Sequence, residues 1–481
     1  MKIIKYTILA CALSLSSCGK SFLEVEPIGQ LGAEQMFQDV QGMSDALIGS
    51  YRLAGDYFES EYSIYGDLRA DDVIRNTVTG SNLLLNEYNY SYDQENVGPT
   101  LGLWREGYAA INNINNVINA ADPIRDKGGV DLARIKMIEG EAHILRGLMF
   151  FALSNIYAQH YTYTADASHL GIPIPLVTPK PGVKMSRASM KATYEQIISD
   201  LKFGIEALGS TKKERVFASA DAAKALLSRI YLYMGDYDNS IKYATEVLDG
   251  GKYPLAKPSE YMDMFRATAQ RKDFSSINAE VIWQFNLTKL RPNSINIFYF
   301  GVESIGAVRP SYIDLFDDQD IRKSMFGFDE RSKSYLSLKY AQYDGVVEAN
   351  VPIVFKVVRS SEMFLNRAEA YFHSKQYDLA VADIKQIRAR AYNVSPQSVT
   401  ISYTSPDELL QQIKLERRKE LGFEGQRIFD IMRYKESLDR GTGCTSPVCK
   451  LSYPNDLFIM PIPKRELDAN DLIIPNPTVN N

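Results

Sequence analysis

The chain has 481 residues, of which 45% are hydrophobic and 23% charged, and its 54 basic and 59 acidic side chains give a formal charge of −5. This composition is that of a folded globular protein and excludes a disordered, collagen-like or polytopic membrane chain. No block is rich in Lys and Arg, so nucleic acid is a poor candidate partner. The 30 Tyr residues, against 2 Trp and 21 Phe, supply many rings that can lie half exposed and recognise a ligand.

The N-terminus has the pattern of a bacterial lipoprotein signal. Lys2 and Lys5 give a charged start, residues 8–15 form a short apolar run, and Leu-Ser-Ser-Cys18 resembles a lipobox. The run is too short to span a bilayer, which takes ~20 residues. The sequence therefore predicts that residues 1–17 are removed and that lipid on Cys18 anchors the protein in a membrane. A plain secretory signal with an incidental cysteine is the alternative.

Helical periodicity dominates the middle of the chain. Apolar positions in steps of three and four predict helices at about 108–118 and 138–156. Two helix pairs follow, at 223–234 with 237–248 and at 364–371 with 377–391. In each pair, two tyrosines six residues apart precede a small residue, which is the spacing of a tetratricopeptide helix pair. We therefore expect a mostly α-helical, tetratricopeptide-like α-α superhelix.

The segments between the helix pairs are rich in proline and poor in strand patterns. We expect one domain over residues 18–481, with a helical scaffold at about 35–260 and 360–392. The parts at about 60–103, 259–352 and 393–481 are predicted to be loop-rich. The large insertion between the two helix pairs is the expected place for recognition loops.

Several distinctive residues are interpreted as structural. Trp104 and Trp283 lie in periodic apolar surroundings and are predicted to be core. His143 lies in a long helix and is expected to be packed. The charged residues between Glu416 and Arg433 are expected to clamp helices together rather than to bind a ligand.

Two cysteines remain near the C-terminus, Cys444 and Cys449. In an exported protein they can close a small loop as a disulfide. Zinc is the weaker interpretation, because no histidine lies nearby and two thiolates do not complete a tetrahedral site.

The sequence contains no recognisable catalytic, metal or cofactor motif. The four histidines are scattered without metal spacing, and no HExxH, dinucleotide-binding glycine run or EF-hand loop is present. Carboxylates at Asp71-Asp72 and Asp317-Asp318-Asp320 leave a glycosidase pair open, since the sequence cannot show the separation of ~5 to 9.5 Å that such a pair needs. We predict no cofactor and a non-enzymatic function, with a surface glycoside hydrolase as the alternative.

Eight segments, in order, resemble the SusD/RagB family of lipid-anchored, nutrient-binding proteins of the outer membrane. They are Cys18–Pro27, Asp67–Asp72, Trp104–Asn115, Gly140–Gly147, Arg309–Arg322, Glu362–Tyr371, Glu416–Arg427 and Met460–Pro463. The resemblance implies a superhelix of four tetratricopeptide-like pairs with a loop-rich face that binds oligosaccharide. It also implies delivery of that ligand at the cell surface to a SusC-like TonB-dependent transporter. A peptide-binding member of the same fold is a further alternative.

Sugars bind to aromatic rings through their C–H faces and to planar amide, carboxylate or guanidinium groups through their hydroxyls. Two segments offer both kinds of group. The candidate ligand-binding residues are Asp67, Arg69, Asp72, Asn76, Tyr88, Tyr90 and Tyr92 in the first, and Arg291, Asn293, Tyr299 and Phe300 in the second. If residues 88–92 are extended, the alternate tyrosines point to one side. They then form either a sugar platform or one face of a half-buried strand.

Overall fold

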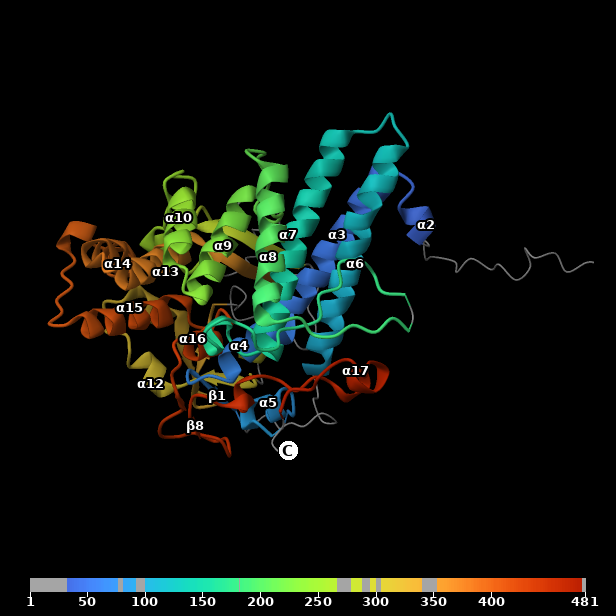
Figure 1. The fold of residues 1–481 in the computed structure, drawn as a ribbon. Helices are drawn as coiled ribbons and strands as arrows, with labels where there is room; N and C mark the ends of the chain where they lie inside the picture. Colours follow the sequence, from blue (N-terminus) through green and yellow to red (C-terminus); the bar gives the residue numbers. More distant parts are fainter. Residues whose placement is uncertain are drawn as a thin grey trace, which may run out of the picture.

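The computed structural model describes residues 33–76, 81–91, 100–180, 182–265, 278–287, 295–299, 304–339 and 353–477. These parts are mostly helical, which confirms the predicted fold class. Four long helices run side by side (Figure 1): α3 (Val40–Tyr57), α6 (Thr100–Asp126), α7 (Leu132–Tyr157) and α8 (Met190–Leu208). Further helices extend the stack: α9 (Ala220–Met234), α10 (Tyr237–Leu248), α13 (Ser360–His373), α14 (Tyr377–Ala391), α15 (Pro406–Leu421) and α16 (Arg427–Arg433).

The predicted helix pair α9 and α10 shows how the sequence sets these boundaries. The Ser219 side chain accepts a hydrogen bond from the Ala222 N–H and starts α9. Gly235, with φ of +75°, ends α9 in a left-handed conformation that glycine adopts without strain. Ser240 of α10 is fully buried and donates to the Ser228 carbonyl at 3.0 Å. The small residue therefore brings the two helices close together, as the spacing predicted.

The insertion between the helix pairs carries strands that the sequence did not predict. One sheet pairs β2 (Val281–Leu287) with β6 (Ile353–Arg359), and the other has the order β1 (Val73–Arg75), β3 (Gly306–Val308), β5 (Ser334–Ser337), β4 (Phe326–Asp329). The expectation that 259–352 is poor in strands is therefore wrong. The strands of three or four residues are too short to show a period of two above background. The seven-residue β2 does alternate apolar and polar side chains from Trp283 to Leu287, and this signal was overlooked. The insertion leaves α10 packed directly against α13.

The prediction of a loop-rich region over 393–481 is also wrong in part, because α15 and α16 lie inside it. Many residues on α15 are charged and yet buried, so the sequence of this helix does not show the apolar stripe that predicts a packed helix. Short elements complete the fold: α2 (Ala33–Met36), α4 (Ser63–Leu68), α5 (Leu85–Asn89), α11 (Ile295–Tyr299), α12 (Pro310–Ile313), β7 (Leu438–Asp439), β8 (Lys450–Leu451) and α17 (Lys464–Ala469).

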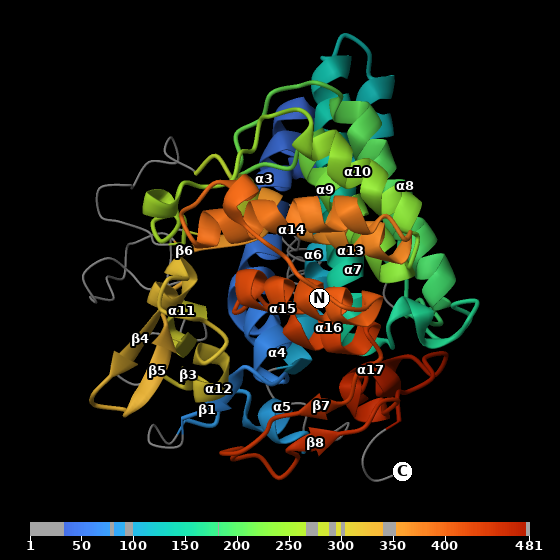
Figure 2. The ribbon, with the colours of Figure 1, turned by 90° about the vertical axis from the view of Figure 1, so that its left-hand side faces the viewer.

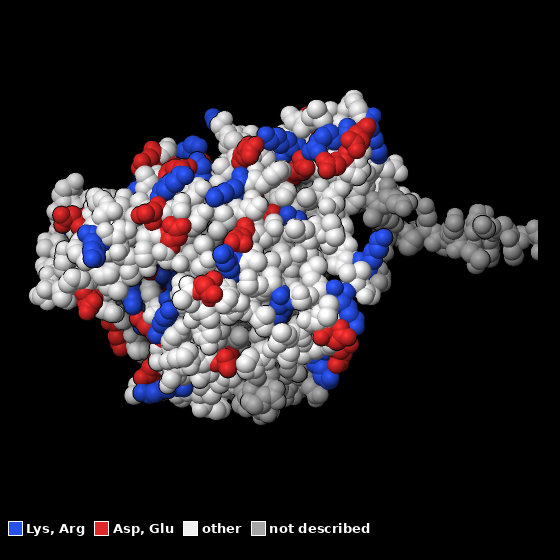
Figure 3. Space-filling model, viewed as in Figure 1, with Lys and Arg blue, Asp and Glu red and all other residues white. Residues whose placement is uncertain are grey.

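The main core lies between the long helices, and two smaller apolar clusters support the strands and the α13–α15 region. Trp104 and Trp283 are both buried, as predicted. His143 packs against Phe203, and its Nδ1 lies 2.7 Å from a carboxylate oxygen of Asp200. Within the described ranges, no helix has the length and apolar character needed to cross a membrane. Acidic and basic side chains are interspersed over the face seen in Figure 3.

Candidate ligand-binding face

Short elements gather at one end of the molecule (Figures 1 and 2). β1, α5, the four-stranded sheet and the β7–β8 hairpin all lie there, below the helical scaffold. We call this end the loop face and define it by the described residues of 67–91, 304–339 and 438–451. It contains most of the residues that the sequence analysis selected for ligand binding.

The three charged candidates at the start of this region are buried and bound within the protein. The guanidinium of Arg69 donates to the carbonyls of Leu457 and Phe458 and lies over the rings of Tyr65 and Tyr90. Asp72 accepts from the Arg418 guanidinium, with Nε at 2.9 Å. Asp67 accepts from the Gly425 N–H at 2.8 Å. These contacts join segments more than 340 residues apart, so the three side chains fasten the loop face to α15 and to the C-terminal segment.

Asp67 also carries an unusual proton affinity. Burial raises the pKa of its carboxyl to about 8, and the hydrogen bond from Gly425 only partly opposes this effect. Glycine is required here at Gly66, because a Cβ at that position would collide with the Gly425 carbonyl. The close approach of the two glycines brings the Gly425 N–H within hydrogen-bond distance of the carboxyl.

This burial predicts a pH dependence of stability. An Asp with a pKa of about 8 in the folded state binds a proton that the unfolded chain releases above pH ~4. Its contribution to the free energy of unfolding therefore falls as pH rises from about 4 to 8, by up to about 1.4 kcal/mol per pH unit. In Asp67→Asn this contribution is absent. Urea titrations at several pH values should therefore show that the wild type loses stability relative to the variant as the pH rises from about 4 to 8. Parallel pH curves for the two chains would contradict the assignment.

Tyr88 and Tyr90 are only 2% exposed, which contradicts the prediction of an exposed sugar platform. The segment is not extended: α5 covers residues 85–89, and Tyr90 caps it in a left-handed conformation with φ of +53°. Tyr90 donates from its hydroxyl to the Arg69 carbonyl at 2.5 Å. The Tyr88 hydroxyl pairs with Thr445 at 2.9 Å. Both rings are therefore packing residues, although in a helix and its cap rather than in a strand.

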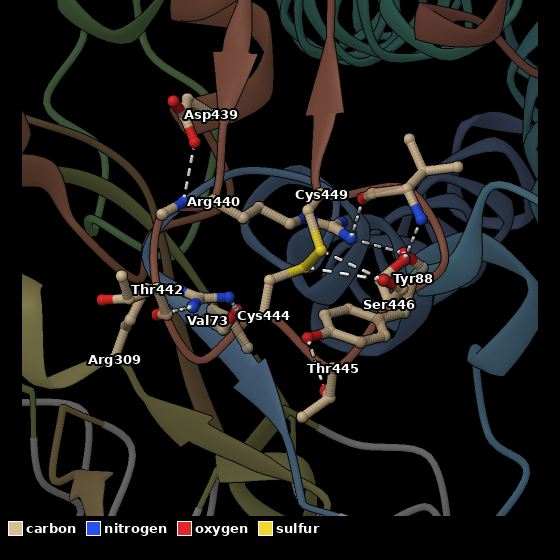
Figure 4. Close-up of a disulfide and its surroundings, with 12 residues drawn as sticks. Val73, Tyr88, Arg309, Asp439, Arg440, Thr442, Cys444, Thr445, Ser446 and Cys449 are labelled. Carbon is tan, nitrogen blue, oxygen red and sulfur yellow. Dashed lines mark hydrogen bonds between the residues drawn. A yellow bond between two sulfur atoms is a disulfide. The ribbon is translucent and has the colours of Figure 1, made fainter.

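The disulfide loop closes the base of this face (Figure 4). Cys444 and Cys449 form a disulfide, with their Cα atoms 5.8 Å apart, which agrees with the sequence interpretation. Beside it, Arg440 donates at 2.7 to 3.2 Å to the backbone carbonyls of Leu68, Arg69, Ala70, Tyr88 and Val448. Arg440 could not be singled out from the sequence, because it stands in a loop without periodicity. Its five donors hold the end of α4, α5 and the disulfide loop together.

The remaining candidates divide between buried and undescribed residues. Tyr299 is fully buried, with its ring 5.3 Å from that of Phe423, so its predicted role on a ligand face is contradicted. Asn76 is half-buried at the end of β1, where its N–H donates to the Ile305 carbonyl at 2.7 Å. Tyr92, Arg291, Asn293 and Phe300 lie outside the described residues.

An aromatic pair that the sequence analysis did not select is accessible on the same face. Phe328 of β4 is 49% exposed, and its ring lies 5.1 Å from that of half-buried Tyr335 on β5. Phe328 pairs with Tyr335, and Tyr335 with Val308, so these side chains share one side of the sheet. This side of the sheet packs against the core at Val308 and is exposed to solvent at Phe328. No sequence signal distinguishes an exposed Phe on a short edge strand from a buried one.

A buried charge network attaches the loop face to the helical scaffold. Glu420 of α15 binds three arginines, Arg322, Arg359 and Arg390, which come from three different parts of the fold. Burial alone would raise the pKa of Glu420, but the three positive charges outweigh it and lower that pKa well below its usual value. Most charged side chains between Glu416 and Arg433 form such internal pairs, which confirms their predicted clamping role.

Comparison with known proteins identifies the family. A family model described as "Starch-binding associating with outer membrane" matches residues 21–232, and the SusD family model matches residues 326–478. "SusD-like protein P2" of Formosa agariphila is 24% identical over 98% of this chain and 99% of its own length.

Solved structures show the same fold. A SusD superfamily protein from Bacteroides thetaiotaomicron is 25% identical, with a TM-score of 0.80 over 91% of this chain and 100% of its own. A "SusD-like carbohydrate binding protein" from Bacteroides vulgatus is 21% identical, with a TM-score of 0.73 over 90% of this chain and 97% of its own. The two family models and the SusD-like relative show that the chain belongs to the SusD/RagB family, whose fold these structures share.

Proposed function

We propose that this protein is a cell-surface lipoprotein that binds oligosaccharide and passes it to a SusC-like TonB-dependent transporter without cleaving it. The observation that carries the proposal is the match of the two family models, one of them described as starch-binding and associated with the outer membrane. On the loop face, Phe328 and Tyr335 form a pair of accessible rings against which the C–H faces of a sugar can pack.

A surface glycoside hydrolase is the alternative from another class. Such an enzyme would need one carboxyl group free to act as the acid and a second free to act as the base or nucleophile. Asp71 is instead bound by Arg427 at 2.8 Å, and this charge, against the effect of burial, lowers the pKa of Asp71 to about 2. Asp320 is likewise bound by Arg322 at 2.8 Å. Both arrangements support the structural interpretation of these carboxylates.

A glycan array probed with the purified protein, followed by incubation with the glycans that bind, separates these functions. We expect binding to one class of oligosaccharide and no release of new reducing ends. Release of reducing ends would overturn the proposal in favour of a hydrolase. Binding to peptides with no glycan bound would favour the peptide-binding alternative.

The lipid anchor is part of the proposal and has its own test. Residues 1–32, with the lipobox and Cys18, lie outside the described residues. If lipid on Cys18 holds the protein on the membrane, Cys18→Ala should move it from the membrane fraction to the soluble fraction, since two or more acyl chains make anchoring durable. The fractionation should be done in cells that lack the transporter, because binding to the transporter would also keep the protein in the membrane fraction. A Cys18→Ala protein that stays in the membrane fraction of those cells would contradict the anchor.

A further inference from the structure

A cavity of about 200 Å³ lies outside the loop face, between α6, residues 173–179 with 183–185, and α17. Trp104, Tyr108 and Asn112 line it from α6, where residues four apart share one side of a helix. Pro173 and Met185 line it from the segment opposite, and Glu466 from α17. At ~30 Å³ for each water, the cavity holds the volume of about seven waters, which is room for one small ring.

The walls of this cavity are held in place by hydrogen bonds. Tyr108 donates from its hydroxyl to the Pro173 carbonyl at 2.9 Å. The Trp104 indole N–H donates to Oε2 of Glu466 at 3.2 Å. Asn470 donates to the Met185 carbonyl at 2.8 Å and so connects the segment after α17 to the opposite wall. The two rings, with centroids 4.8 Å apart, and the carboxylate are therefore preorganised beside one another.

The charge of Glu466 has no counterion among the described residues. Its Oε1 forms no hydrogen bond or ion pair with them, and two lysines near lining residues in the sequence are paired with other carboxylates. Lys464 binds Asp468 and Lys184 binds Asp471, each at 2.9 Å. Arg465 precedes Glu466 directly, and adjacent residues on a helix do not face each other.

Arg187 also acts electrostatically on Tyr108 of the cavity, but its guanidinium is committed elsewhere. Its guanidinium donates to five neutral oxygens, those of Tyr157, Leu170, Gly171, Ile474 and Asn476. All of its donors are therefore in use. The pKa of Tyr108 is raised well above its usual value, by burial first and by the Glu466 carboxylate second.

A carboxylate beside an aromatic ring attracts a cation, and the half-buried ring of Tyr108 also accepts the C–H face of a sugar. Trp104 is 3% exposed and packs edge-on against Tyr157, so it forms the back wall of the cavity. The Asn112 side chain, which is half-buried on the same wall, offers an amide to a hydroxyl group. We propose that this cavity is a second ligand site that takes one amino-sugar residue in its ammonium form. The site is separate from Phe328, so it can be tested whether or not the loop face binds glycan.

The probe is glucosamine, titrated at pH 6 into the full chain, with glucose as the uncharged comparison. We expect glucosamine to bind at least about tenfold more tightly than glucose. Glu466→Gln, which keeps an acceptor for the Trp104 N–H, should weaken glucosamine binding at least about fivefold and leave the unfolding midpoint within about 2 °C. Asp468→Asn is the matched control, because it removes the same charge from α17 at an exposed position paired with Lys464, and glucosamine affinity should not change.

Four results would overturn the proposal, three with the sugars and one with a lysine derivative. One is equal affinity for glucose and glucosamine, and another is equal weakening by Asp468→Asn and Glu466→Gln, which would show only a general charge effect. The third is no binding of glucosamine up to about 50 mM. Tighter binding of Nα-acetyl-lysine amide than of glucosamine would also count against it, because the cavity would then favour a protein side chain.

Discussion

Replacing Glu420 by Ala is expected to lower the free energy of unfolding by ~3–5 kcal/mol, the cost of breaking a buried ion pair by removing one partner. Glu420 is fully buried and binds Arg322, Arg359 and Arg390. Its removal leaves these arginines with less negative charge in a place that water does not reach. The measurement is equilibrium unfolding in urea, with the slope of the transition compared between variants.

Two controls separate this loss from a general effect of charge. Glu420→Gln keeps the shape and an acceptor but removes the charge, so it should also destabilise the chain strongly. Glu330→Ala breaks an exposed pair with Lys333, whose side chains are 78% and 72% exposed, and should change stability very little. A Glu420→Ala variant with the stability of Glu330→Ala would show that the network is not what holds the loop face to the scaffold.

Truncation of Tyr88 or Tyr90 to Ala is expected to cost ~3–5 kcal/mol each, the range for a large aromatic residue in a core. Both rings are buried and lie close to the Arg440 guanidinium, at 4.4 and 5.1 Å. Loss of either ring also uncovers this buried cation. Any loss of glycan affinity in these variants should therefore follow their unfolding. Melting temperature and affinity should be measured on the same samples.

The matched controls are Tyr88→Phe and Tyr90→Phe, which keep the rings and remove the hydroxyls. Each loses one hydrogen bond, to Thr445 or to the Arg69 carbonyl, and should cost only about 1 kcal/mol. If instead the Ala variants kept the unfolding midpoint of the wild type and lost glycan binding, the rings would be a sugar platform and the packing role given to them here would be wrong.

The helical scaffold could be predicted from the sequence because its signals are local. The α9–α10 pair is defined by apolar spacing, by the capping residues Ser219 and Asp236 and by Gly235, all within 30 residues. The short strands of the insertion could not be predicted in this way. β3 and β4 have only three and four residues, and β3 pairs with β1, which is distant in the sequence.

The candidate site was harder to predict because residue type does not show burial. Asp67, Arg69 and Asp72 look like surface residues in the sequence. Each is instead neutralised or hydrogen-bonded by a partner that follows hundreds of residues later, such as Arg418 or the Leu457 carbonyl. Phe328 shows the reverse case, since a Phe is expected in a core and this one reaches solvent at a sheet edge. The family resemblance predicted the kind of face but not its accessible side chains.

The most direct test of the account is a titration of the strongest glycan from the array into the wild type, Phe328→Ala and Leu379→Ala. Phe328 and Leu379 are 49% and 45% exposed, but Leu379 lies on α14, away from the loop face. If the loop face binds glycan through its accessible rings, Phe328→Ala should bind at least about tenfold more weakly, with its unfolding midpoint nearly unchanged, while Leu379→Ala binds like the wild type. Wild-type affinity in Phe328→Ala, or an equal loss in Leu379→Ala, would contradict a glycan site at this face.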